Sequence, residues 1–292
     1  MNFSTASLVN RNSSKLSKKI KLPFVIHIVG TNGKGSTGRF LAHYLHKIDF
    51  KVLHYSSPHI MKFNERIWIN GNDVSDQNLD IAHKFLQEIL SLELLRKLTY
   101  FEYTTLLALY LSKDCDYLVL EAGLGGEFDA TNVVENNLSL ITTIGLDHQS
   151  FLGNTVSEIA ATKMRSVDNK MLIGYQVFDE VIKTAYKVKK QILEQRNRNI
   201  EIIEIKEFEK YKLNDKFASY LKRNLHLVIA CLNELKIDID LTLFDDVKLF
   251  GRCQKIASNI TIDVGHNPLA AQVIAKEFEG RKVIIRIYAI IH

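Results

Sequence analysis

The sequence predicts an α/β fold: a mostly parallel sheet of the P-loop type, flanked by helices and followed by an incomplete second α/β domain. Short apolar runs alternate with helical patterns through the first half of the 292 residues, as in a parallel sheet. A glycine-rich stretch, residues 30–36, separates the first run from the first helix. Acidic or small residues follow several later runs. We place the first domain at residues 1–250 and the second at 251–292.

The individual elements follow from periodicity. Apolar, β-prone runs predict strands at 24–29, 52–55, 117–120, 138–143 and 171–173. Apolar residues three or four apart predict helices at 38–47, 76–95, 101–111, 155–163 and 179–195. In the second domain we expect a strand at 256–263, a helix at 269–278 and a β-prone run at 282–291. The charged stretches 183–198 and 204–212 are expected to be solvated faces.

Composition excludes several classes of protein. The sequence has no uncharged run of 18 residues, so we expect no membrane partner. Residues 1–21 lack the apolar segment of a secretory signal. The net charge of +5 is mild, and the basic residues form no aromatic-interleaved patch, so we expect no nucleic-acid partner. Three distant cysteines, Cys115, Cys231 and Cys253, indicate a reducing cytoplasm.

The stretch G-T-N-G-K-G-S at residues 30–36 predicts a phosphate-binding loop. Its glycines let backbone N–H groups face a polyphosphate, and the following helix adds positive potential. Lys34 would reach the terminal phosphates, and the Ser36 hydroxyl would lie near the metal that accompanies ATP. The spacing departs from the general phosphate-loop pattern, because Gly35 separates Lys34 from Ser36. The alternative is a glycine turn that binds nothing.

Three polar clusters follow later strands, at the sheet edge where open α/β folds bind ligands. Ser56 and Ser57 follow the second strand, and the Ser57 hydroxyl suits magnesium or a phosphate oxygen. Glu121 ends the third strand, and magnesium bound to ATP commonly takes one or two protein carboxylates. His148 follows the fourth strand and suits a second ion. The alternatives are a Ser-Pro turn and a histidine that only makes a hydrogen bond.

Two further residues have ambiguous local patterns. Lys163 ends the predicted helix 155–163, where a cation is favourable by itself. Asp263 ends an apolar run and could hold a ribose or orient an arginine, although a turn at the Asn-Pro pair explains this segment equally well. The sequence has neither an H-E-x-x-H nor a G-x-S-x-G pattern, so hydrolase activity has no support.

Together these segments resemble the Mur ligase superfamily and, within it, the folylpolyglutamate synthase/dihydrofolate synthase family. The order and spacing of the shared motifs hold from residue 25 to residue 268. The resemblance implies an ATP-binding central domain at 1–250 and a fragment of the C-terminal glutamate-ligase domain at 251–292. The motifs are 30–36, 56–59, 63–66, 99–103, 120–126, 128–132, 145–148 and 263–268. Two of them, 99–103 and 128–132, disfavour a peptidoglycan-type Mur ligase.

The resemblance implies a ligase that uses ATP and Mg²⁺, with room for a second ion or K⁺. The carboxylate of dihydropteroate or a reduced folate would attack the γ-phosphate, and L-glutamate would displace phosphate from the acyl phosphate. Lys34 and Lys163 would be catalytic, with Lys163 carried as a carbamate. The residues implied to bind ATP are Gly33, Lys34, Gly35, Ser36, Asn224, Arg252 and Asp263; those for metal are Ser57, Glu121 and His148; those for the acid substrate are Ser56, Ser57, Thr99, Tyr100, Phe101, Glu102, Phe128, Asp129 and Ala130.

The sequence departs from the family pattern at three points. Glu127 stands where the family has arginine, which reverses a charge beside the substrate loop. Met164-Arg165-Ser166 stands where Ala-Gly-Ile is usual, which places bulk and charge beside the metal site. Val264-Gly265 replaces Gly-Ala in the last motif, a milder change. These departures predict weakened activity.

The chain ends soon after the first motif of the second domain. We therefore expect a truncated or frameshifted product, or half of a split enzyme completed by a C-terminal chain. The alternative function is a non-catalytic remnant that binds nucleotide or folate. Otherwise the resemblance implies a monomer. The sequence leaves the choice between dihydropteroate and a reduced folate open.

Overall fold

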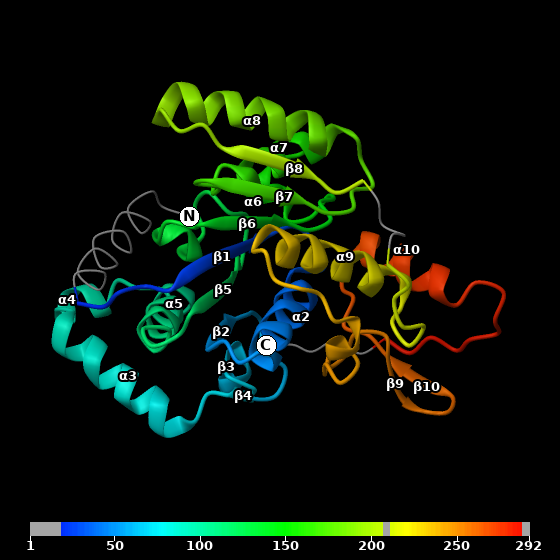
Figure 1. Cartoon of the computed structure of the whole chain (residues 1–292), viewed down its shortest axis with the longest axis horizontal. Coiled ribbons are helices and arrows are strands. Elements are labelled where there is room, and N and C mark those ends of the chain that lie inside the picture. The colour runs from blue at the N-terminus through cyan, green and yellow to red at the C-terminus, as the bar shows by residue number, and fades with distance from the viewer. Residues whose placement is uncertain (1–18, 207–210, 288–292) are drawn as a thin grey trace.

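The computed structural model describes residues 19–206 and 211–287, and its centre is an eight-stranded sheet (Figure 1). The strand order is β4-β3-β2-β5-β1-β6-β7-β8. The first eighteen residues of the expected N-terminal segment lie outside the described residues. The strands are β1 Phe24–Val29, β2 Val52–Tyr55, β3 Ile67–Ile69, β4 Asn72–Asp73, β5 Tyr117–Glu121, β6 Leu138–Ile141, β7 Lys170–Ile173 and β8 Glu201–Glu204.

All five predicted strands form, and they pair in parallel as expected. Because β1 lies between β5 and β6, its carboxyl end and those of its neighbours meet at one edge. Three further strands were not predicted. Strands β3 and β4, at one end of the sheet, are short and antiparallel, and β8, at the other end, pairs in parallel with β7. β8 lies partly within a stretch predicted to be a solvated face, and its Glu-Ile-Ile-Glu sequence is too short and too charged to show a buried strand.

Most helices match the prediction, with three corrections. The helix expected at 38–47 begins at Lys34, because Gly33 takes the left-handed conformation at its N-cap. The helix expected at 76–95 is two helices, because Leu90 is extended and Ser91 caps a new turn. α9 was missed. The helices are α2 Lys34–Lys47, α3 Asp76–Ile89, α4 Leu92–Leu95, α5 Tyr100–Leu111, α6 Gln149–Leu152, α7 Val156–Met164, α8 Glu180–Arg196, α9 Ser219–Glu234 and α10 Pro268–Glu277, with short 3₁₀ turns Phe63–Arg66, Ala130–Val133 and Leu241–Phe244.

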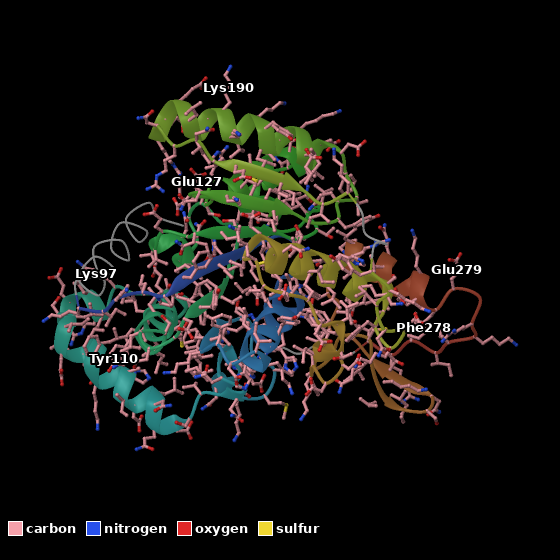
Figure 2. The ribbon with its side chains drawn as sticks, in the orientation of Figure 1. Lys97, Tyr110, Glu127, Lys190, Phe278 and Glu279 are labelled. Atoms are coloured by element: carbon pink, nitrogen blue, oxygen red, sulfur yellow. The ribbon has the colours of Figure 1, made fainter. Side chains whose placement is uncertain are left out.

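The helices cover both faces of the sheet. Alternate residues of β1 point to the two faces. On one face Ile26 and Ile28 pack with α2 and α9. On the other face Val25 packs with α3 and α5, and Val29 packs with α7 and α8. The charged outer surface of α8 is solvated as predicted, and Lys190 points away from the sheet (Figure 2). Every helix in the described ranges is too short or too polar to cross a membrane.

The segment after residue 250 holds a hairpin and one helix. The strand expected at 256–263 is instead two antiparallel strands, β9 Gln254–Ala257 and β10 Ile260–Ile262, because the chain turns at residues 258–259. The predicted helix is α10, and none of its residues is buried. The run expected to be β-prone has no strand over 282–287, and residues 288–291 lie outside the described part.

Candidate active site

A single pocket at the carboxyl edge of the sheet brings together every residue predicted for nucleotide, metal and catalysis. They come from the phosphate loop, from the ends of β2, β5 and β6, from α7 and α9, and from the segment after residue 250. Residues more than two hundred positions apart in the sequence therefore line the same cavity. They are Gly33, Lys34, Gly35, Ser36, Ser57, Glu121, His148, Lys163, Asn224, Arg252 and Asp263.

The phosphate loop is held in shape by its own neighbours. Thr31 donates its hydroxyl proton to the Gly145 carbonyl at 3.0 Å, and its backbone N–H donates to the Thr143 carbonyl at 2.9 Å. Gly33 has φ +90°, and a side chain there would lie 2.6 Å from the Asn224 amide oxygen. The loop therefore enters α2 directly, leaving the first N–H groups of the helix available to an anion. Lys34 lies in the first turn, with Nζ 3.2 Å from the Gly30 carbonyl.

The predicted metal ligands line the same pocket, and Glu121 lies against the phosphate loop, where a side chain at Gly35 would be 3.3 Å from its Oε2. Glu121 ends β5 with 5% of its surface exposed. Burial raises the pKa of its carboxyl, and the positive charges of Lys34 and Arg252 partly offset this effect by lowering it. The Ser57 backbone N–H donates to Glu121 Oε2 at 3.4 Å, so Ser57 and Glu121 occupy one corner of the pocket. His148 lies on the pocket's more exposed side, with about half of its side chain in solvent.

These donors fit magnesium better than a closed metal cage. The described residues contain no cluster of three or more His, Cys, Asp or Glu side chains around a common metal position. Magnesium usually takes one or two protein carboxylates and completes its shell with phosphate oxygens and water. A carboxylate and a hydroxyl beside a phosphate loop meet that requirement.

Lys163 reaches the pocket from the last turn of α7 and is only 4% exposed. Burial, with a further effect from Lys34, lowers the pKa of its amine to about 7. Among the described residues, no carboxylate lies within ion-pair distance of its Nζ. A lysine so placed is partly neutral at physiological pH and is chemically reactive.

The second half of the chain closes the pocket. Asn224, on α9, donates to the Ser36 hydroxyl at 2.9 Å. The Asp263 carboxylate is already engaged, because it accepts from the Tyr220 hydroxyl at 2.6 Å and from the Cys253 N–H at 2.7 Å. It therefore organises the turn beside Arg252 as well as facing the cavity.

Sequence reasoning missed two contacts across the pocket. The amides of Asn32 and Asn267 bond reciprocally, at 3.1 and 2.7 Å, and join the phosphate loop to the N-cap of α10. The Arg223 guanidinium lies 3.8 Å from the centre of the Tyr175 ring, and both residues line the pocket. Tyr175 follows β7 at the ligand-binding edge, so the strand-end rule could have identified it. Arg223 required knowledge of α9.

The residues predicted to bind the acid substrate lie outside this pocket, except Ser57. Thr99 and Glu102 cap α5 instead: Glu102 Oε2 accepts from both the N–H and the hydroxyl of Thr99, each at 2.7 Å. Phe101 packs close to Gly123, where an added side chain would lie 2.7 Å from its ring. Tyr100 is exposed, with the Arg66 guanidinium 5.4 Å from its ring centre.

The remaining residues predicted to bind the acid substrate lie at the end of β2 and in the loop after β5. Ser56 follows β2, and its backbone N–H donates to the Arg66 carbonyl at 2.8 Å. Phe128 is half exposed, and Ala130 begins a 3₁₀ turn. Asp129 is buried, and its carboxylate accepts from groups of its own loop. The loop that carries Phe128, Asp129 and Ala130 reaches the pocket through residues 123–125.

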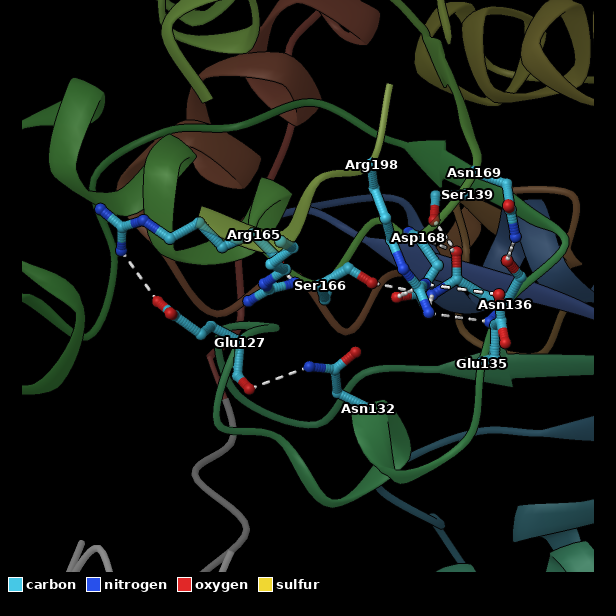
Figure 3. A network of polar contacts seen from close by, with 11 residues as sticks. Glu127, Asn132, Glu135, Asn136, Ser139, Arg165, Ser166, Asp168, Asn169 and Arg198 are labelled. Carbon is cyan, nitrogen blue, oxygen red and sulfur yellow. Dashed lines mark hydrogen bonds and ion pairs between the residues drawn. The ribbon is translucent and has the colours of Figure 1, made fainter. Parts of the chain in front are cut away.

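Two departures from the family pattern meet in space. Arg165 donates to the Glu127 carboxylate at 2.8 Å, and Figure 3 shows the two side chains pointing toward each other. The Glu127 N–H also donates to the Thr162 carbonyl at 2.9 Å, and its carbonyl accepts from Asn132 at 2.9 Å. The loop after β5 is thereby attached to the helix that carries Lys163.

Comparison with known proteins decides the family. No protein-family model matches the chain. A dihydrofolate synthase/folylpolyglutamate synthase of Haemophilus influenzae is 32% identical to it over 305 residues, covering 92% of this chain and 68% of that enzyme. This chain belongs to the dihydrofolate synthase/folylpolyglutamate synthase family. The Escherichia coli member is 31% identical and is covered over 67% of its length. The chain thus spans about two thirds of these curated relatives.

Solved structures of the family share the fold. The Helicobacter pylori folylpolyglutamate synthetase is 36% identical, with a TM-score of 0.74 over 94% of this chain and 71% of that one. Escherichia coli FolC in complex with DHPP and ADP is 26% identical, with a TM-score of 0.78 over 96% of this chain and 70% of that one. The predicted family and the mostly parallel α/β architecture are both confirmed.

Proposed function

We propose that this chain ligates L-glutamate to dihydropteroate, to the γ-carboxyl of a reduced folate, or to both, at the expense of ATP. The observation that carries the proposal is the single pocket that joins the phosphate loop, buried Glu121 and buried Lys163. Membership of the dihydrofolate synthase/folylpolyglutamate synthase family supports the same activity. A remnant that binds nucleotide without turnover is less favoured, because the pocket contains the residues proposed for catalysis, Lys34 and Lys163, as well as those for nucleotide.

The reaction proceeds in two steps. A carboxylate oxygen of the acid attacks the γ-phosphorus of ATP, the bond to the bridging oxygen breaks, and ADP leaves. The amino group of glutamate then attacks the acyl carbon, and phosphate departs from the tetrahedral intermediate as the amine loses its proton. Lys34 and the first N–H groups of α2 hold the phosphoryl oxygens and neutralise their charge. Asn224, Arg252 and Asp263, from the second half of the chain, complete the nucleotide site.

Magnesium, when bound, would neutralise phosphate charge at the corner formed by Ser57 and Glu121, with His148 available to a second ion. K⁺ is a further candidate cation. The neutral amine of Lys163 can add to carbon dioxide with release of a proton, and the resulting carbamate would place a carboxylate in the same pocket. Its pKa of about 7 supports this assignment, because only an unprotonated amine forms a carbamate.

The acid substrate would lie beside the pocket, over the surface formed by Ser56, Tyr100, Phe101 and Phe128. The exposed aromatic rings of Tyr100 and Phe128 suit a pterin ring. Functionally we divide the chain at residue 250, with the ATP-binding domain before it and part of the glutamate-ligase domain after it. We further propose a monomer. A cytoplasmic location fits the three unpaired cysteines.

Incorporation of labelled L-glutamate tests the proposal. The purified chain is incubated with ATP, magnesium, bicarbonate and either dihydropteroate or tetrahydrofolate. Glutamate-dependent ADP release with a labelled product would establish the ligase and identify its acceptor. A folded chain that binds ATP but forms no labelled product with either acceptor would contradict the proposal and favour the remnant.

A further inference from the structure

Three buried side chains link the strand before the phosphate loop to the loop after β5. His27 lies on β1 with Nε2 2.8 Å from Thr131 Oγ1, and Thr131 Oγ1 lies 2.6 Å from Asp129 Oδ1. We propose that His27 and Thr131 are positioning residues of the ligase, which fix the Asp129 carboxylate and through it the loop beside the acid substrate. This inference rests on the proposed function.

The directions of these hydrogen bonds follow from the donors available. Asp129 Oδ1 accepts from the Thr131 N–H at 2.9 Å and from its hydroxyl, and Oδ2 accepts from the Leu124 N–H at 2.8 Å. Burial raises the pKa of the Asp129 carboxyl, and these three donors oppose that effect. Because the Thr131 hydroxyl gives its proton to Asp129, its oxygen accepts from His27 Nε2–H.

His27 is held as the neutral Nε2–H tautomer. Burial lowers the pKa of its ring to about 4, so it carries no charge at neutral pH. Its Nδ1 is a buried acceptor that has no partner among the described residues. An apolar side chain would fill this core position without an unsatisfied atom. What the imidazole adds is the single donor to Thr131, and a polar group kept in a core at such a cost is typical of a functional site.

The fixed loop borders both parts of the active site. Leu124, which bonds to Asp129, lines the nucleotide pocket, and half-exposed Phe128 is adjacent to Asp129 in the chain. The Asp129 carboxylate is also close enough to act on the charges of Lys34 and Lys163. A change in its position therefore alters the surface that orients the acid, whereas the phosphate loop keeps its own bonds to Thr143, Gly145 and Asn224.

Paired substitutions test the inference. His27→Leu and Thr131→Val remove the two hydrogen bonds, whereas His27→Gln and Thr131→Ser keep a donor and a hydroxyl. Ser139→Ala is the matched control, because it removes a buried hydroxyl that bonds to Asn136 at 2.8 Å outside the pocket. We expect the first two variants to raise KM for the acid about tenfold with KM for ATP within about twofold, and the conservative pair to stay close to the parent.

Hydrogen exchange at the Leu124 and Thr131 amides provides a second readout. Faster exchange in Thr131→Val and His27→Leu, but not in Ser139→Ala, is expected. Unchanged KM for the acid, or an equal rise in the Ser139→Ala variant, would overturn the inference. Absence of turnover in the parent chain would overturn the proposed function separately. In that case unchanged amide exchange would also refute the positioning of the loop.

Discussion

The Arg165 guanidinium lies 2.8 Å from the Glu127 carboxylate, and the pair joins the end of α7 to the loop after β5 (Figure 3). Each residue alone departs from the family pattern and suggests a damaged site. Together they form an ion pair, with about a third of the Arg165 side chain and a fifth of that of Glu127 exposed. The reversed charge at 127 is therefore balanced locally, and the loop stays attached to the helix that carries Lys163.

Exchanging these two charges tests their coupling. We expect Glu127→Arg or Arg165→Glu alone to lower the ligation rate about tenfold, because like charges would push the loop from α7. Each single variant should lower the free energy of unfolding by only about 1 kcal/mol, since the pair is partly exposed. The double exchange should recover most of the rate. A double variant as slow as either single one would contradict the coupling; Glu93→Lys, in the exposed Glu93–Lys97 pair, is the control.

Replacing the phosphate-loop lysine should abolish turnover. We expect Lys34→Met to lower the ligation rate by about a thousandfold, because the charge that neutralises the γ-phosphate is lost. Lys190→Met, on the outer face of α8, is the matched control and should retain the parent rate. Both rates are measured with saturating acid and glutamate. More than about a tenth of the parent rate in Lys34→Met would argue against this role.

The buried amine of Lys163 predicts a pH dependence. Burial lowers its pKa to about 7, so carbamate formation should increase as pH rises through 7. In buffer free of carbon dioxide the unfolded lysine keeps its proton up to about pH 10.4, while the folded one loses it near 7. The unfolded state binds more protons in that window, so stability should rise with pH, by at most about 1.4 kcal/mol per unit.

Lys163→Met supplies the comparison for both effects. The variant should lack the carbamate signal in ¹³C spectra recorded with labelled bicarbonate. The free energy of unfolding of the variant should depend less on pH than that of the parent. At pH 6 the variant should be more stable by about 2 kcal/mol, because an uncompensated buried cation is removed. Denaturant unfolding between pH 6 and 9 measures the pH dependence and the difference at pH 6. An identical pH slope in parent and variant would refute the lowered pKa.

The capping contacts of Thr99 predict a structural effect. Thr99→Ala should lower the free energy of unfolding by about 1 kcal/mol, because α5 loses the hydroxyl that caps its Glu102 N–H. Thr99→Ser should remain near the parent. Urea unfolding measures both, with KM for the acid recorded in parallel. Unchanged stability with a raised KM would instead favour the substrate contact predicted from the family.

The sequence contained the strand-loop-helix unit and the strand ends, so it predicted the pocket around Lys34 and Glu121 well. It did not predict α9, and so missed the Tyr175–Arg223 contact across the pocket. It also could not show that Glu127 meets a residue 38 positions later. Such pairings depend on tertiary packing, which local periodicity does not encode.

Transfer of ¹⁸O from the acid to phosphate is the most direct test of the proposed chemistry. The acid is labelled in its reacting carboxylate and supplied with ATP, magnesium, bicarbonate and glutamate. Attack of that carboxylate on the γ-phosphorus predicts one ¹⁸O atom in each phosphate released. Phosphate released during amide formation without the label would contradict an acyl-phosphate ligase in this pocket.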